Sequence, residues 1–142
     1  MSQQEKSEQK TKVLIMSCSG AANVGQLSNQ VALELVQERF ARPFCLAGIS
    51  AHRRGFVRAA SEADNIVVDG CAIGCGKTIL EHAEIPIKTY LVLTDLGIEK
   101  KMSSELSREE IDRAKEVIRE LWETDQPGFS AQEMDTDSSC CS

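Results

Sequence analysis

Short apolar runs alternate with amphipathic stretches along the middle of the chain. The runs occupy residues 13–16, 44–46, 66–68 and 90–93, and such runs between amphipathic segments are typical of buried strands. Strands that are separated by crossover helices pair in parallel, with right-handed connections. The alternation therefore predicts one α/β domain, a three-layer Rossmann-like fold of about four mainly parallel strands with flanking helices. For the strand order we assume 2-1-3-4, which the alternation does not determine.

Four segments have the residue spacing of amphipathic helices. The first places Leu27, Val31 and Leu35 on one face, and the last begins with a capping box in which Glu110 follows Ser107. The predicted helices cover residues 24–41, 52–62 and 76–83 and a last segment that begins after Ser107.

The ends of the chain differ in composition from its middle. The 142 residues suffice for one compact domain, but both ends are polar and carry too few apolar groups to offset the entropy of ordering. We therefore expect a flexible tail at residues 1–11, the α/β domain at 12–123 and a flexible polar tail at 124–142.

Charge and hydropathy exclude several classes of partner. The net charge is −6, with 16 Lys and Arg against 22 Asp and Glu, and no basic block with interleaved aromatics marks a nucleic-acid surface. No apolar run approaches the roughly 20 residues of a membrane span, and the polar start lacks the apolar core of a signal peptide. We expect a cytoplasmic protein with neither nucleic acid nor membrane as partner.

Cysteines follow or end three successive predicted strands. Cys18 follows the first run, Cys45 lies in the second, and Cys71 and Cys75 come directly after the third. Ligands of open α/β sheets bind at the carboxyl ends of strands, and four soft thiolates suit a tetrahedral zinc ion. Because cytosolic thiols stay reduced, the pattern predicts that these cysteines form a zinc or related soft-metal site.

Other interpretations of the same cysteines remain open. Cys45, in an apolar run, is the one most readily explained as a core residue. Cys18 precedes a predicted helix N-terminus, where a thiolate is stabilised and can act as a nucleophile. Cys71 and Cys75 would then be a dithiol pair in a thiol redox or sulfur-transfer enzyme. The sequence does not decide whether the protein is an enzyme.

Several residues near the cysteines are candidates for contacts with a bound group. Gly20 and Gly25 permit close approach of a small anion to the backbone. Asp69 stands at a strand end, where it can orient a ligand or accept N–H bonds in the turn. Asp95, after the fourth strand, is expected on the same rim. His52 and His82 are candidates for fifth or replacement ligands, but isolated histidines on amphipathic helices are more often surface or boundary residues, and we favour that interpretation.

Two phosphate-binding motifs fail on spacing. Gly76, Lys77 and Thr78 imitate the end of a phosphate loop, but that motif requires glycine where the chain has Cys71. A cysteine phosphatase requires an arginine after five intervening residues from Cys18, and that position is Val24. The glycine-rich segments are therefore not interpreted as nucleotide or phosphoester sites.

Four segments carry a family resemblance: CSGAANVG, CLAGIS, IVVDGCAIGCGKTIL and LTDLGIEK, between residues 13 and 101. In this order and spacing they resemble the DGC-domain family of zinc-binding proteins. The cysteines that mark the family correspond to Cys18, Cys45, Cys71 and Cys75. The resemblance implies a zinc site and brings no catalytic activity, and it does not extend to Cys140 and Cys141 in the C-terminal tail.

Overall fold

The computed structural model describes residues 11–124. Its four strands form one sheet in the order β2-β1-β3-β4, and all neighbouring pairs are parallel. The strands are β1 (Val13–Ser17), β2 (Arg42–Pro43), β3 (Asp64–Asp69) and β4 (Thr89–Val92). The predicted α/β class and strand order are confirmed, whereas the two predicted tails fall almost entirely outside the described residues.

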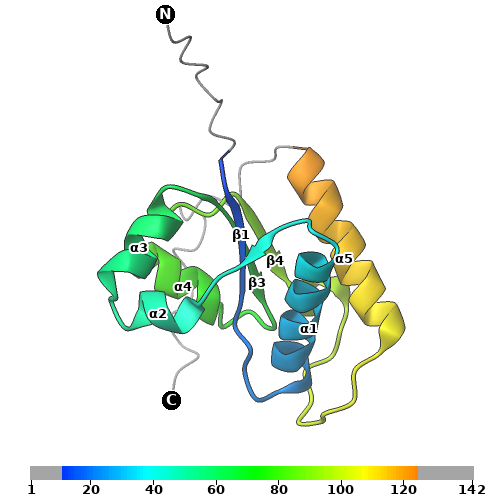
Figure 1. Cartoon of the computed structure of the whole chain (residues 1–142). Coiled ribbons are helices and arrows are strands. Elements are labelled where there is room, and N and C mark those ends of the chain that lie inside the picture. Colours follow the sequence, from blue (N-terminus) through cyan, green and yellow to red (C-terminus); the bar gives the residue numbers. More distant parts are fainter. Residues whose placement is uncertain (1–10, 125–142) are drawn as a thin grey trace, which may run out of the picture.

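Helices cover both faces of the sheet (Figure 1). The helices are α1 (Asn23–Gln37), α2 (Leu46–Ser50), α3 (Arg54–Ser61), α4 (Cys75–His82) and α5 (Arg108–Glu123), with a 3-10 turn η1 (Leu93–Leu96) after β4. Ile66 and Val68 point to the core under α1 and α5, and Val67 points to the core under α2, α3 and α4. This alternation of side chains along β3 makes the three layers.

The second predicted strand is misplaced. The sheet pairs through Arg42 and Pro43 rather than 44–46, and Leu46 already begins α2. Cys45 is the N-cap of that helix, and its sulfur accepts a bond from the Gly48 N–H at 3.4 Å. Residues 44–46 pack against the core from a loop and the start of a helix. A short apolar run looks the same in the sequence whether it forms a strand, a loop or a helix.

The first helix is shorter than the predicted 24–41 and ends at Gln37. Arg39 has a left-handed φ of 61°, which terminates the helix, and the Phe40 N–H then donates to the Leu35 carbonyl at 2.9 Å. The reversal sets the Phe40 ring edge-on to Trp122, with ring centres 6.2 Å apart. The other helix boundaries lie within about two residues of their predictions.

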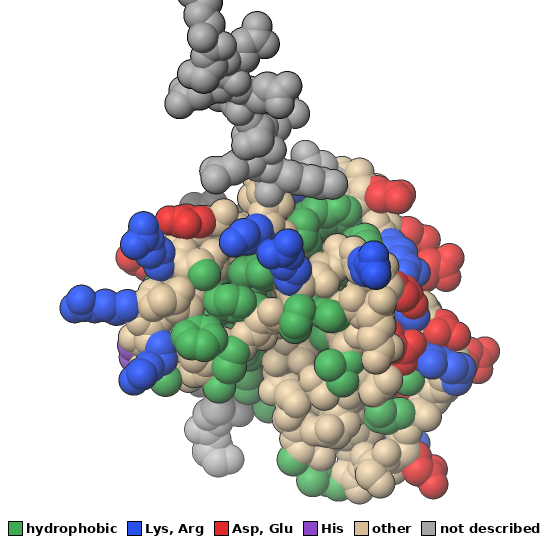
Figure 2. Space-filling view, in the orientation of Figure 1, with side chains coloured by type: hydrophobic (Ala, Val, Ile, Leu, Met, Phe, Trp, Pro, Cys, Tyr) green, Lys and Arg blue, Asp and Glu red, His purple; other side chains and the backbone are tan. Residues whose placement is uncertain are grey.

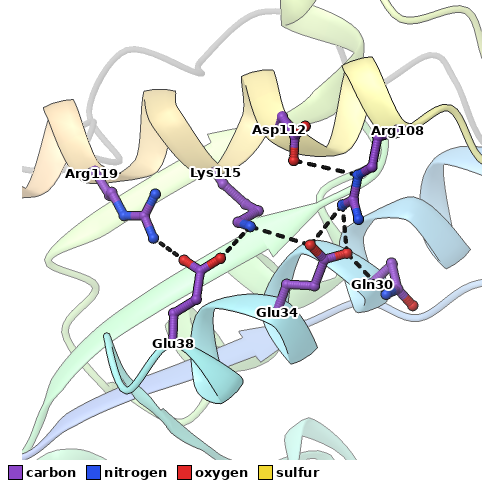
Figure 3. A network of polar contacts seen from close by, with 7 residues as sticks. All are labelled: Gln30, Glu34, Glu38, Arg108, Asp112, Lys115 and Arg119. Atoms are coloured by element: carbon purple, nitrogen blue, oxygen red, sulfur yellow. Dashed lines mark hydrogen bonds and ion pairs between the residues drawn. The ribbon is translucent and has the colours of Figure 1, made fainter.

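A polar network joins α1 to α5 (Figure 3). The Lys115 side chain, only 9% exposed, reaches Glu34 at 3.2 Å and also contacts Glu38, which pairs with Arg119. Arg108 contacts both oxygens of Glu34 at 2.6 Å. Charged groups this close to the core are stable only when paired, so the network fixes how the two helices pack.

Glu34 makes the packing of α1 and α5 sensitive to acid. Burial alone raises the pKa of Glu34, but hydrogen bonds from Arg108, Gln30 and Lys115 outweigh it and lower the pKa from 4.5 to about 2. Because the pKa of Glu34 is lower in the folded protein than in the unfolded chain, its ionised carboxylate stabilises the fold above pH 4.5. This stabilisation is lost as the pH falls toward 2. Arg108 is 61% exposed and solvent screens its charge, so the contribution is about 2 kcal/mol.

Urea unfolding of wild type and Glu34→Gln between pH 7 and pH 2 measures this contribution. The variant is expected to be less stable by about 2 kcal/mol at pH 7 and to lose less stability between pH 4.5 and pH 2. Parallel pH profiles of the two proteins would contradict the assignment. Exposed Glu123→Gln, at the last residue of α5, is the matched control.

Within the part of the chain that the structure covers, no helix combines the length and apolar character needed to cross a membrane.

Candidate thiol site

The cysteines lie along the carboxyl edge of the sheet. Cys18 follows β1 and donates its N–H to the Val68 carbonyl at 3.1 Å. Cys45 follows β2, Cys71 follows β3, and Cys75 is the first residue of α4. Because β1 lies between β2 and β3, Cys18 stands in the middle of this edge.

The sulfur of Cys18 is held between the loop after β3 and the start of α1. It accepts a hydrogen bond from the Gly70 N–H at 3.3 Å and contacts the Ser28 hydroxyl at 3.4 Å. Ser28 is fully buried and donates to the Gly25 carbonyl at 2.6 Å. The thiol is therefore placed by buried groups, although Cys18 itself is only half-buried.

Cys18 also lines a hollow of about 460 Å³ between α1 and α2. Phe44 and Leu46 form part of its wall. Figure 2 shows hydrophobic side chains on this face with Lys and Arg beside them. Leu33, which lines the hollow, is 44% exposed. The hollow gives a small molecule or ion a route to the Cys18 thiol.

Cys18, Cys71 and Cys75 are close enough to interact electrostatically. Burial raises the pKa of the Cys75 thiol, and the negative charges of Asp69, Cys18 and Cys71 raise it further. The Lys100 ammonium lies 3.6 Å from the Cys71 sulfur. Cys45 is exposed and caps α2 instead. Three of the four predicted ligands thus lie within electrostatic range of one another, and Cys45 lies at the same edge of the sheet as the N-cap of α2.

The Asp69 carboxylate accepts hydrogen bonds from other groups of the protein. Its side chain is 1% exposed and accepts bonds from the N–H groups of Gly76 at 2.8 Å and Lys77 at 3.0 Å, and from the Tyr90 hydroxyl at 2.7 Å. Burial first, and then the bond to Asp69, raise the pKa of Tyr90, which keeps its hydroxyl protonated as a donor. Asp69 therefore caps α4 and ties it to β4.

The glycines of the motif allow backbones to approach each other. A Cβ on Gly25 would lie 2.5 Å from the Gly20 carbonyl oxygen, and one on Gly70 would lie 2.6 Å from the Val24 carbonyl carbon. The Gly25 N–H donates to the Ala22 carbonyl at 3.0 Å. Gly25 and Gly70 thus bring the ends of β1 and β3 against the start of α1, while Gly20 has open space beside it.

A second hollow, of about 360 Å³, lies on the other side of the cysteine loop at the end of β4. Asp95 lines it together with Ile73, Lys77 and Tyr90. Asp95 is therefore near the cysteine loop, as expected, but on the β4 side of it. The sequence gives no signal that Lys100, Ser28 and Tyr90 belong to the site. Lys100 ends the LTDLGIEK segment, and Ser28 and Tyr90 lie in the predicted first helix and fourth strand, but no spacing connects them with the cysteines.

The donor set suits a soft metal, but the described conformation is not a closed metal site. Within residues 11–124, no three His, Cys, Asp or Glu side chains are already grouped to hold an ion. Thiols are nevertheless the ligands that zinc, copper(I) and iron–sulfur clusters prefer, and Cys71 and Cys75 belong to one short loop.

The fold and the edge of the sheet define a small parallel α/β domain that carries cysteines at the carboxyl ends of its strands. The DGC domain family matches residues 14–118, and the chain belongs to this family. A relative from Pseudomonas aeruginosa, named anaerobic and virulence modulator AnvM, is 33% identical over 101 residues, which cover 70% of this chain and 77% of AnvM. No solved structure matches the chain significantly.

Proposed function

We propose that this protein binds a soft metal ion, zinc in the first instance, through the thiolates of Cys18, Cys71 and Cys75, with Cys45 as the fourth ligand. The observation that carries the proposal is that Cys18, Cys71 and Cys75, which follow β1, follow β3 and begin α4, lie at one edge of the sheet. We place this activity in the cytoplasm, where thiols stay reduced.

The electrostatics of the three thiols support a cation as their partner. Ionisation of Cys75 is opposed by burial and by the negative charges of Asp69, Cys18 and Cys71. A divalent ion reverses each of these effects, because coordination deprotonates thiols and neutralises their mutual repulsion. Negative charge near Cys75 raises the pKa of its thiol when no metal is present. The same negative charge would attract and hold a bound cation.

Cys45 decides what the bound ion can do. To join the site its sulfur must leave the Gly48 N–H, a weak bond at 3.4 Å. Four thiolates close the coordination sphere of zinc and suit a structural, storage or sensing role, whereas three leave a position for water or substrate. The name of AnvM describes a modulator, and we extend this to a sensing or regulatory role here.

Metal analysis of protein purified under reducing conditions tests the proposal. Wild type is expected to hold one zinc per chain, and Cys18→Ser, Cys71→Ser and Cys75→Ser are each expected to lose at least about 100-fold in affinity, beyond what a lost supporting contact costs. Cobalt substitution reports the number of thiolates by its absorption. The double variant Cys140→Ser/Cys141→Ser, outside the described residues, is the matched control and should retain the metal.

Two results would contradict the proposal. One is that all three single variants retain zinc, and the other is that fully reduced wild-type protein binds no zinc. Loss of zinc in Cys45→Ser assigns a four-thiolate site, and retention with one coordinated water assigns a three-thiolate site. Both of these outcomes support metal binding and distinguish its two forms.

The alternative is a thiol redox or sulfur-transfer enzyme, which the contact between Lys100 and Cys71 at 3.6 Å favours. Reactive cysteines typically have a cationic neighbour. The Cys18 thiolate would attack an acceptor disulfide and release one acceptor thiol, which leaves a mixed disulfide. Cys71 would attack the Cys18 sulfur and release the second acceptor thiol, and Cys75 would then attack Cys71, which forms the Cys71–Cys75 disulfide and restores the Cys18 thiol. A reversible Cys71–Cys75 disulfide in a fully active metal-free protein identifies this function.

A further inference from the structure

The two histidines of the chain face each other across two helical segments. His52 lies between α2 and α3, His82 is the last residue of α4, and their ring centres are 5.7 Å apart with the planes at 59°. The whole chain contains no other histidine. We infer that His52 and His82 together bind one divalent transition-metal ion, zinc in the first instance, at an accessory site separate from the thiols.

The separation of the rings matches a shared ion. An imidazole nitrogen lies about 2.1 Å from a bound zinc and the ring centre about 1.2 Å further, so two rings on one tetrahedral ion have centres about 5 to 6 Å apart. The observed 5.7 Å lies within this range. The tilted planes are compatible with coordination, since each ring is free to rotate about its own metal–nitrogen bond.

The backbone under both histidines is fixed. His52 has a left-handed φ of 55°, and its N–H donates to the Ile49 carbonyl at 2.9 Å. Ile49 and Leu80 are buried in one core cluster, which packs α2 against α4. Both imidazoles are thus presented from packed elements, and binding an ion orders only two exposed side chains.

The charge near the pair includes favourable and unfavourable contributions. His82 occupies the last turn of α4, where the helix dipole stabilises a cation. Arg53, next to His52, opposes a cation. With two protein ligands, water fills the remaining positions, so the ion binds more weakly than at a closed four-thiolate site.

The accessory site is distinct from the thiol site. Cys75 and His82 are the first and last residues of α4, about 10 Å apart along a helix that rises 1.5 Å per residue. An ion on the histidines ties the far end of α4 to the turn between α2 and α3. It therefore stiffens the helix that carries Cys75, whether or not the thiols themselves bind metal.

Calorimetric titration of the full chain with zinc tests the inference, with all thiols blocked by a methanethiosulfonate reagent. The blocked wild type is expected to bind one zinc, and His52→Asn and His82→Gln are each expected to lower the affinity at least tenfold. Asparagine is chosen because it tolerates the left-handed backbone at position 52. Exposed Glu62→Gln is the control and should bind like wild type.

Blocked wild type that binds zinc no better than the double histidine variant overturns the inference, as does loss of binding in only one of the single variants, since a shared ion requires both rings. Failure here is distinguishable from failure of the thiol site, because the histidine variants with free thiols report that site alone. Circular dichroism of each variant verifies that the fold is retained.

Discussion

A Gly70→Ala variant is expected to be less stable than wild type by about 3 kcal/mol, the upper part of the usual cost of overpacking. The added Cβ would lie 2.6 Å from the Val24 carbonyl carbon and 2.8 Å from the Gly25 nitrogen. These are backbone atoms at the start of α1, so no side chain can rotate away. Relief requires the helix to move from the end of β3, and that movement removes the Gly70 N–H from the Cys18 sulfur.

Thermal and urea unfolding measure the effect, which corresponds to a fall in Tm of about 10 to 20 °C for a domain of this size. Gly20→Ala is the matched control, because a Cβ there meets nothing within 4 Å and should change stability by less than about 0.5 kcal/mol. A Gly70→Ala protein as stable as the Gly20→Ala control would show that α1 is not held as closely as the structure places it.

The parallel sheet and the edge that carries the cysteines were predictable for the same reason. Apolar runs separated by helical segments specify parallel pairing, and parallel pairing puts every carboxyl end at one edge. The placement of Cys18 after β1 and of Cys71 after β3 follows directly. The sequence does not predict which thiols approach one another, because this depends on how the chain turns after each strand.

Cys45 illustrates the limit for local structure. Serine, threonine, aspartate and asparagine are the usual N-cap residues, so a cysteine between Phe44 and Leu46 gives no sign that a helix begins after it. The sequence therefore predicts a strand for this run. In the structure the Cys45 sulfur accepts a hydrogen bond from the Gly48 N–H and caps α2. Only the packing of α2 on the sheet selects the helix.

Asp69 and the histidine pair illustrate the limit for distant contacts. The partners of Asp69 lie seven, eight and twenty-one residues further along the chain, and His52 meets a residue thirty positions away. No periodicity connects such positions. Of the roles considered for Asp69, accepting N–H bonds is the one that the structure shows, and both histidines are exposed as predicted. The Tyr90 bond to Asp69 and the contact between the two rings could not be predicted, because the sequence shows neighbours in the chain rather than neighbours in space.

The cap on α4 leads to the second large effect, an Asp69→Ala variant that is expected to lose about 4 kcal/mol of stability. The change leaves two backbone N–H groups and the Tyr90 hydroxyl without their acceptor in a buried place. Each such bond to a charged group contributes about 1.5–3 kcal/mol, and a buried donor without a partner adds a desolvation cost. The total loss is smaller than the sum of these costs, because water that enters as α4 loosens can accept hydrogen bonds from the freed donors.

Two further variants apportion this loss. Asp69→Asn keeps the shape and one acceptor oxygen but presents an amide to the remaining donors, so about 2–3 kcal/mol should be lost. Tyr90→Phe removes one donor together with its own need for a partner and should cost less than either. Urea unfolding of the metal-free proteins gives the ranking. An Asp69→Asn protein with wild-type stability but impaired zinc binding would instead assign Asp69 to the metal, because a cap acts on the fold before it acts on the thiols.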